Sequence, residues 1–336
     1  MTRFIDPGLG ENCSLASFLK NPGGGVSEKI EEIELKPCKS DSGEYLIESN
    51  LAKRLGSVDL DGKTLEFVLG SNADRFSNIK SSEELGVFDI SWENHKIKVY
   101  SSGKIEVRQG TNRDEMRKIL RNIEKLVVNS FNCDDCNRVL LDCVSGKCSV
   151  CTGDLDRIEL DGYFRPMVEK SLNSLLSTCN DLLESGFGLE NLSDGDEVER
   201  FKPVLQKSFR TSSSLIVNST ERNSLLAGWE IQSMIFDNFR VLECFYSFLE
   251  SGNSNEEMLE SILNNYLSIN KEMTLLYKGS EVKIQDLIRS AFGLMREWRE
   301  FRESFEIQKL ENEFDFVDQV FSGNISRLKV LQKVYF

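Results

Sequence analysis

Residues 133–153 read CDDCNRVLLDCVSGKCSVCTG and contain five of the nine cysteines of the 336-residue chain. The stretch holds two C-x2-C pairs separated by eleven residues, and Cys143 lies between the pairs. A C-x2-C turn holds two thiolates about one tetrahedral edge apart, so two pairs supply the four sulfurs of a metal site. The spacing therefore predicts a metal centre whose ligands are Cys133, Cys136, Cys148 and Cys151.

Three interpretations of this stretch differ in the metal. Structural Zn²⁺ is favoured, because modules of this size bury too little apolar surface to fold without a metal and zinc ribbons use two C-x2-C pairs. A ribbon has a hairpin between its pairs, here with a strand at 139–141 and a turn at Ser145-Gly146. The second interpretation is a [4Fe–4S] cluster in which Cys143 is the alternative ligand, although the ferredoxin run C-x2-C-x2-C-x3-C-P is absent. The third is that the thiols bind no metal.

The overall charge limits the classes of partner. The chain has 41 Lys and Arg against 55 Asp and Glu, a net charge of −14, which excludes a protein that coats nucleic acid or an anionic membrane with its whole surface. The N-terminal segment lacks the basic stretch and apolar run of a signal peptide, and no stretch approaches the roughly 18 uncharged apolar residues of a spanning helix. We therefore expect a cytoplasmic protein that binds no membrane and whose cysteines are reduced unless a metal binds them.

The segment before the cysteines, residues 85–131, is expected to form a ββα unit with a basic helix. Apolar and polar residues alternate over 87–90, 97–100 and 105–107, as they do in half-buried strands. An apolar stripe at helical spacing then runs from Met116 to Val127 and leads directly to the cysteines.

The two ends of the chain have different patterns. Residues 1–84 are expected to form a small, irregular α/β or β region. Its expected strands are 32–35, 45–48 and 64–69. Residues 164–336 show helical periodicity and capping patterns, which predict an all-helical bundle with the nearly all-apolar segment 221–250 at its centre. The predicted fold class is α+β, with a zinc-ribbon-like metal-binding module at 132–163 between the sheet unit and the bundle.

A local basic stripe lies beside the predicted metal site. Between His95 and Lys125 there are nine Lys or Arg against four Asp or Glu, and Arg113, Arg117 and Arg121 recur at every fourth position of the helix. The residues expected to contact nucleic acid or an acidic partner are Lys104, Arg108, Arg113, Arg117, Lys118, Arg121 and Lys125. The alternative, which is commoner for charge runs, is a solvated helix face that pairs with the protein's own acids.

Sequence motifs of common catalytic sites are absent. The chain contains no G-x-S-x-G, G-x-x-x-x-G-K-[ST], G-x-G-x-x-G or H-E-x-x-H. His95, the single histidine, falls in a strand turn, where a histidine is usually exposed and rarely catalytic.

Residues 85–166 resemble part of a known protein family. The hairpin IKVYSSGKIEV at 97–107, the helix after it, the cysteine stretch and FRP at 164–166 resemble the cysteine-rich region that precedes the catalytic domain of archaeal PAPS-reductase-like proteins. The resemblance implies metal binding at the four predicted cysteines. It does not imply reductase or ATP-pyrophosphatase activity, because that family's phosphate-binding SGGxDS loop is absent here.

These patterns predict a non-enzymatic, metal-binding protein that serves as an interaction or scaffolding subunit of an intracellular complex. Zinc is the expected metal, the helical bundle is the expected surface for a protein partner, and the basic helix is the expected contact for nucleic acid. The alternative function is an iron–sulfur accessory protein that transfers electrons, or assists sulfur or nucleotide chemistry on a separate catalytic chain.

Overall fold

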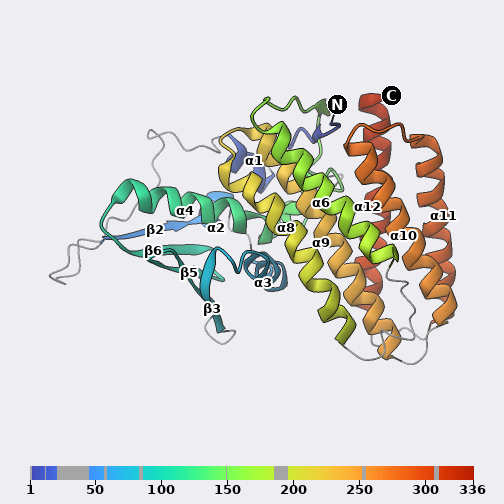
Figure 1. The fold of residues 1–336 in the computed structure, drawn as a ribbon, viewed down its shortest axis with the longest axis horizontal. Helices are drawn as coiled ribbons and strands as arrows, with labels where there is room; N and C mark the ends of the chain where they lie inside the picture. The colour runs from blue at the N-terminus through green and yellow to red at the C-terminus, as the bar shows by residue number, and fades with distance from the viewer. Residues whose placement is uncertain are drawn as a thin grey trace.

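The computed structural model describes residues 2–11, 13–20, 45–56, 59–82, 86–148, 150–184, 196–251, 255–305 and 310–336. Its architecture is α+β, as the sequence predicts. Figure 1 shows helix α4 (Arg113–Val127) lying along the sheet and the long helices of the bundle standing beside both of them. The two ends of the chain meet at one end of the molecule, where the Arg3 guanidinium lies 4.8 Å from the centre of the Phe336 ring. The strand expected at 32–35 lies outside the described residues.

The larger sheet is antiparallel throughout, with the strand order β2-β6-β5-β4-β3. Its strands are β2 (Tyr45–Asn50), β3 (Phe76–Ser82), β4 (Val87–Trp92), β5 (His95–Tyr100) and β6 (Lys104–Gly110). The strands expected at 45–48, 87–90, 97–100 and 105–107 are confirmed. The edge strand β3 is additional, because its polar sequence FSNIKSS has no apolar alternation that would predict it.

Helix α4 covers β6 and β2 with the predicted apolar stripe. The side chain of Asn112 accepts hydrogen bonds from the backbone N–H groups of Asp114 (3.0 Å) and Glu115 (3.3 Å), so it caps the first turn. The capping residue is thus Asn112. The helix continues into the 3₁₀ turn η1 (Val128–Ser130), which ends just before the first clustered cysteine.

The strand expected at 64–69 is wrong, because these residues lie in helix α3 (Gly62–Ser71). A short apolar run does not distinguish a strand from a buried helical turn, and capping decides between them here. The carboxylate of Asp61 accepts the Thr64 N–H at 2.7 Å. The helix then packs Phe67 against the rings of Phe209 and Phe239 in the bundle.

From Arg165 onward every element in the described part of the chain is helical. The helices are α6 (Arg165–Glu184), α8 (Asp196–Asn218), α9 (Arg222–Glu250), α10 (Glu256–Tyr277), α11 (Ile284–Ser304) and α12 (Glu311–Tyr335). Helix α9 packs against α8, α6, α10 and α12, so it is the central helix, as its all-round apolar sequence predicts. None of the helices in the described ranges is long and apolar enough to cross a membrane.

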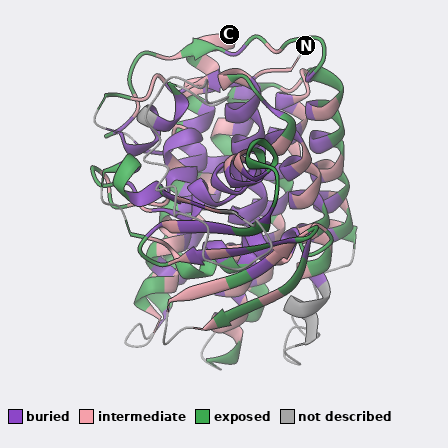
Figure 2. Ribbon diagram, turned by 90° about the vertical axis from the view of Figure 1, so that its left-hand side faces the viewer, coloured by how far each residue is buried: buried purple, intermediate pink, exposed green. Residues whose placement is uncertain are grey.

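Short elements join the sheet to the bundle. They are β1 (Ile5–Asp6), α1 (Ser14–Leu19), α2 (Leu51–Leu55), α5 (Leu140–Val144) and β7 (Asp156–Arg157). Figure 2 shows that buried residues concentrate where these elements and the helices meet, whereas the outer strands are largely exposed or intermediate. The buried apolar residues form one continuous core from Phe4 to Leu331.

The segment that carries the cysteines is anchored to the bundle by a buried lysine. Lys147 forms an ion pair with Asp237 and donates to Ser233 Oγ at 3.1 Å, and both partners lie on α9. The Lys147 side chain is 2% exposed and the Asp237 side chain 6%. The lysine stem also passes Gly323 on α12, where a Cβ atom would lie only 2.9 Å from it.

A second buried ionic group lies beside the first. Arg327 on α12 lies 3.9 Å from Glu230 on α9 and donates to the Ser145 carbonyl at 3.4 Å, so it also contacts the cysteine segment. The Tyr277 hydroxyl donates to the same Glu230 carboxyl. Burial raises the pKa of Glu230 to about 7, and the positive charge of Arg327 opposes this shift.

Lys147→Met should lower the free energy of unfolding by about 3–5 kcal/mol, because it leaves Asp237 buried without its counter-ion. Chemical denaturation of the full chain measures this loss. Adding Asp237→Asn should recover part of it. The matched control is Asp142→Asn, which removes a more exposed partner 3.5 Å from the ammonium group and should cost about 1 kcal/mol or less. Equal losses for Lys147→Met and Asp142→Asn would contradict the anchoring role.

Glu230 should make stability fall as pH rises from about 4.5 to about 7. In this interval the folded carboxyl keeps a proton that the unfolded chain has released, so the proton stabilises the fold below the interval and is lost above it. The expected loss is about 3 kcal/mol. Glu230→Gln removes this contribution, so the difference between the two proteins in urea denaturation should change across the interval. Parallel pH profiles would argue against a raised pKa.

Candidate metal centre

Six cysteine sulfurs come together where the N-terminal segment, the cysteine stretch and the bundle meet. We call this group the thiolate cluster; its members are Cys13, Cys133, Cys136, Cys143, Cys148 and Cys151. Five of them are buried and Cys136 is intermediate. The structure therefore brings together the four predicted ligands, the alternative ligand Cys143, and one cysteine that the spacing did not predict.

The additional cysteine, Cys13, is positioned by backbone hydrogen bonds between the N-terminal segment and the cysteine stretch. The N-terminal segment runs beside the end of the cysteine stretch, with hydrogen bonds from Gly10 N to the Cys151 carbonyl and from Gly153 N to the Pro7 carbonyl, both 3.0 Å long. Strand β1 then pairs with β7. Gly8 makes this approach possible, because it has φ +56° and a Cβ atom there would lie 1.9 Å from a backbone oxygen.

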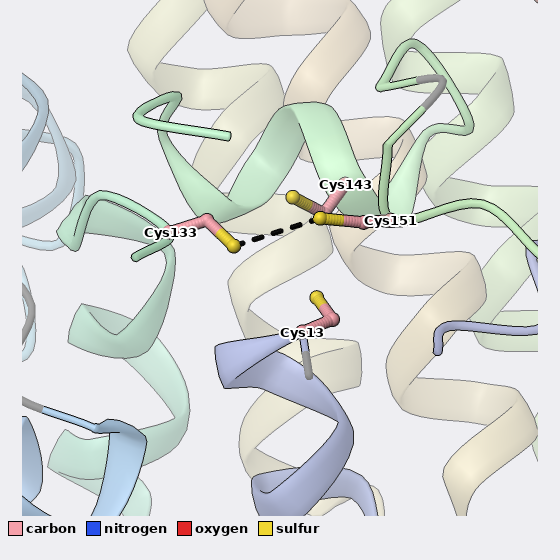
Figure 3. A group of neighbouring side chains, drawn as sticks. All are labelled: Cys13, Cys133, Cys143 and Cys151. Carbon is pink, nitrogen blue, oxygen red and sulfur yellow. Dashed lines mark hydrogen bonds between the residues drawn. The ribbon is translucent and has the colours of Figure 1, made fainter. Parts of the chain in front are cut away.

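Cys13 is the residue immediately before helix α1. Figure 3 shows its sulfur pointing toward those of Cys133, Cys143 and Cys151. The Ser14 hydroxyl accepts the Asp134 N–H at 3.2 Å across a separation of 120 residues. No local spacing marks a contact between such distant segments, so sequence reasoning missed this residue.

The hairpin expected between the two C-x2-C pairs is wrong. Val139 forms only an isolated bridge with Asn132, and the expected strand at 139–141 gives way to the helical turn α5. A helix suits these residues because it buries Leu140, Leu141 and Val144 together. It also turns Cys143 toward the other sulfurs (Figure 3).

The six sulfurs fall into two overlapping sets of four, and within each set all sulfurs lie within 4.8 Å of one another. Cys13 and Cys133 belong to the first set, Cys136 and Cys148 to the second, and Cys143 and Cys151 to both. The first predicted pair is thus divided between the sets. The Cys133–Cys151 and Cys136–Cys143 sulfurs are each 3.6 Å apart, close to the edge of about 3.8 Å that tetrahedral Zn–S bonds of about 2.3 Å require.

The hydrogen bonds of the thiols make Cys143 the hub of the cluster. Hydrogen bonding with the neighbouring sulfurs, that of Cys13 first, raises the pKa of Cys143, and burial adds to this shift. The same hydrogen bonds lower the pKa of Cys13, of Cys133 to about 3 and of Cys148 to about 5. Burial raises the pKa of Cys151. A metal ion bound among these sulfurs would replace the protons that the thiols share.

An all-sulfur, largely buried site suits a soft or borderline metal ion and leaves little room for chemistry. Thiolates select Zn²⁺, Cu⁺ or iron–sulfur clusters over Mg²⁺ and Ca²⁺. A catalytic zinc site keeps one position for water or substrate, whereas a structural site is closed by protein ligands. Each set already contains four sulfurs, so the arrangement corresponds to a closed site.

The residues of the predicted basic stripe have different environments. Lys125 is buried, donates to the Ser219 carbonyl at 2.6 Å and has a lowered pKa because of its burial. Lys104 and Arg108 both form ion pairs with Glu106 on β6. The members with exposed or half-exposed side chains on α4 are Arg113, Arg117, Lys118 and Arg121.

His95 is buried, not exposed as a turn histidine would be. It pairs with Trp92 at the start of β5, and its Nδ1 atom has no hydrogen-bond partner among the described residues. Its ring lies within 4.8 Å of the carboxylates of Glu93 and Glu115, which are exposed. This group is open to water, in contrast to the thiolate cluster.

Comparison of the chain with family models, with curated proteins and with solved structures finds no match. The resemblance of residues 85–166 to archaeal PAPS-reductase-like proteins therefore stays a hypothesis. What the structure establishes is a buried cluster of cysteines that could hold a metal.

Proposed function

We propose that the thiolate cluster binds zinc and acts as a structural joint in a non-enzymatic interaction or scaffolding subunit. The observation that carries this proposal is the convergence of six cysteines from two separate segments, the N-terminal segment and the cysteine stretch, on one buried point. A metal there ties the N-terminal segment to the cysteine stretch, which Lys147 in turn anchors to the bundle. Its binding free energy then becomes part of the folding free energy.

Zinc fits the sulfur positions better than the alternative iron–sulfur cluster. A [4Fe–4S] cluster places irons and inorganic sulfides between the thiolates, so its cysteine sulfurs lie farther apart than those around a single ion. The closest sulfur pairs here are 3.6 Å apart. The described cysteines form no disulfides, which agrees with the reducing cytoplasm as the location that we propose.

The partner surface that we propose lies on the bundle, between α11 and α12. Phe292 is 48% exposed there, in a groove that also contains Met295 and Ile325. Arg296 and Arg299 line the same groove. An apolar centre with cations around it suits a protein segment that carries apolar and acidic side chains. Nucleic acid at the exposed residues of α4 is the alternative.

Protein purified without oxygen should be colourless and contain zinc, with iron far below one atom per chain. Removal of the metal by a chelator should lower Tm by about 10 °C or more, because structural zinc contributes several kcal/mol to folding. Cys244→Ser, a buried cysteine outside the cluster, is the control that should keep its zinc. A brown, iron-containing sample would support the iron–sulfur alternative, and a metal-free chain insensitive to chelation would contradict both.

Two variants separate the partner classes. Phe292→Asp should abolish co-purification of a protein partner from the source cells and leave the zinc content unchanged, because it places a charge at the centre of the groove. Lys118→Glu with Arg121→Glu should leave that partner bound. If instead the second variant loses nucleic-acid binding that falls steeply across a salt series, the basic helix is the contact surface.

A further inference from the structure

We propose that the thiolate cluster holds two metal ions and that the thiolates of Cys143 and Cys151 bridge them. This inference rests on the proposed function, because it specifies how the same zinc centre is loaded. The remaining ligands are Cys13 with Cys133 for one ion, and Cys136 with Cys148 for the other.

The geometry of the sulfurs carries the proposal. Each set of four sulfurs is compact enough for one ion, and the two sets have two members in common. Two tetrahedra that share an edge have this composition: two sulfurs at the shared edge and two more on each side. The 3.6 Å separations each join a shared sulfur to an outer one, Cys151 to Cys133 and Cys143 to Cys136, so both tetrahedra have an edge of the length that zinc requires.

The contacts of the individual sulfurs distinguish shared from outer positions. The Cys143 sulfur lies 3.6 Å from that of Cys136 and the Cys151 sulfur 3.6 Å from that of Cys133, so each shared sulfur contacts an outer sulfur of a different set. The outer sulfurs of Cys13, Cys133 and Cys148 also accept hydrogen bonds from nearby backbone N–H groups. A terminal thiolate keeps more negative charge than a bridging one and gains more from such donors.

A single ion would leave the cluster incomplete. Whichever set it occupied, two cysteines of the other set would remain as thiols beside its ligands. The two ions together carry four positive charges against six thiolates, so one buried site can hold all six sulfurs with only a small residual negative charge. The binuclear arrangement therefore uses every sulfur that the fold brings to this point.

The test is the number of zinc ions bound by the reduced, full-length chain, counted by native mass spectrometry and by colorimetric release. The wild type should bind two. Cys13→Ser and Cys136→Ser each remove an outer ligand of a different ion and should each retain one tightly bound zinc. Cys143→Ser removes a ligand from both ions and should retain the least. Cys244→Ser, buried but outside the cluster, should retain two.

A measurement on the wild type alone guards against variants that fail to fold. Loaded with ¹¹³Cd²⁺, the chain should show two cadmium resonances split by coupling through the shared sulfurs. One zinc per chain, or two uncoupled resonances, would overturn the binuclear site and leave the structural zinc function intact. A chain that binds no zinc at all would overturn both.

Discussion

Convergence of six cysteine sulfurs on one buried point is the constraint on which the rest of the structure depends. In the described residues of 132–163, regular structure is limited to the single turn of α5 and the two-residue strand β7. The path of this segment is set by what its side chains contact: the clustered sulfurs on one side, and, through Lys147, Asp237 of the bundle on the other. The buried ion pair supplies the second of these attachments, and the metal ion that we propose would supply the first. Without both, the sheet unit and the bundle would be joined mainly by the contacts of α3 and α4 with α8.

The attachment through the sulfurs and the attachment through the buried ion pair involve neighbouring residues, so a displacement of one affects the other. Lys147 precedes Cys148, so a ligand to the metal and a buried counter-ion for Asp237 share one stretch of backbone. A buried ion pair adds little net stability compared with an apolar pair. It nevertheless fixes the positions of its two side chains, because separating them would leave a buried charge without a counter-ion, which is costly in free energy. Gly323 adds a steric restriction, because it leaves just enough space for the lysine stem. Displacement of the cysteine loop would therefore disturb α9 and α12 as well as the sulfurs.

Sequence patterns correctly predicted the elements whose structure depends only on the residues of their own segment. The alternation in β4, β5 and β6, the stripe of α4 and the all-round apolar character of α9 each follow from one segment and the surface it buries. The predictions were wrong or incomplete where contacts with a distant segment determine the local structure. The residues of α3 and α5 suit a strand or a helix; both segments pack against bundle helices, and Asp61 also caps α3. Cys13 gives no signal at all, because its partners lie about 120 residues away and a glycine-lined backbone pairing brings it to them.

The burial of the cysteine cluster also explains why we propose a structural role for it and not a catalytic one. A catalytic metal needs an open coordination position and a path for substrate, whereas these sulfurs are nearly all buried and surround one another. Cys13 is the residue that most strongly supports a structural role. A metal bound only by residues 133–151 would stabilise a small local module. With a ligand from the N-terminal segment, the metal that we propose would be a crosslink between distant parts of the chain, which removes far more conformational freedom from the unfolded state. The sulfur that the spacing did not predict is thus the one that would turn a local metal module into a joint for the whole fold.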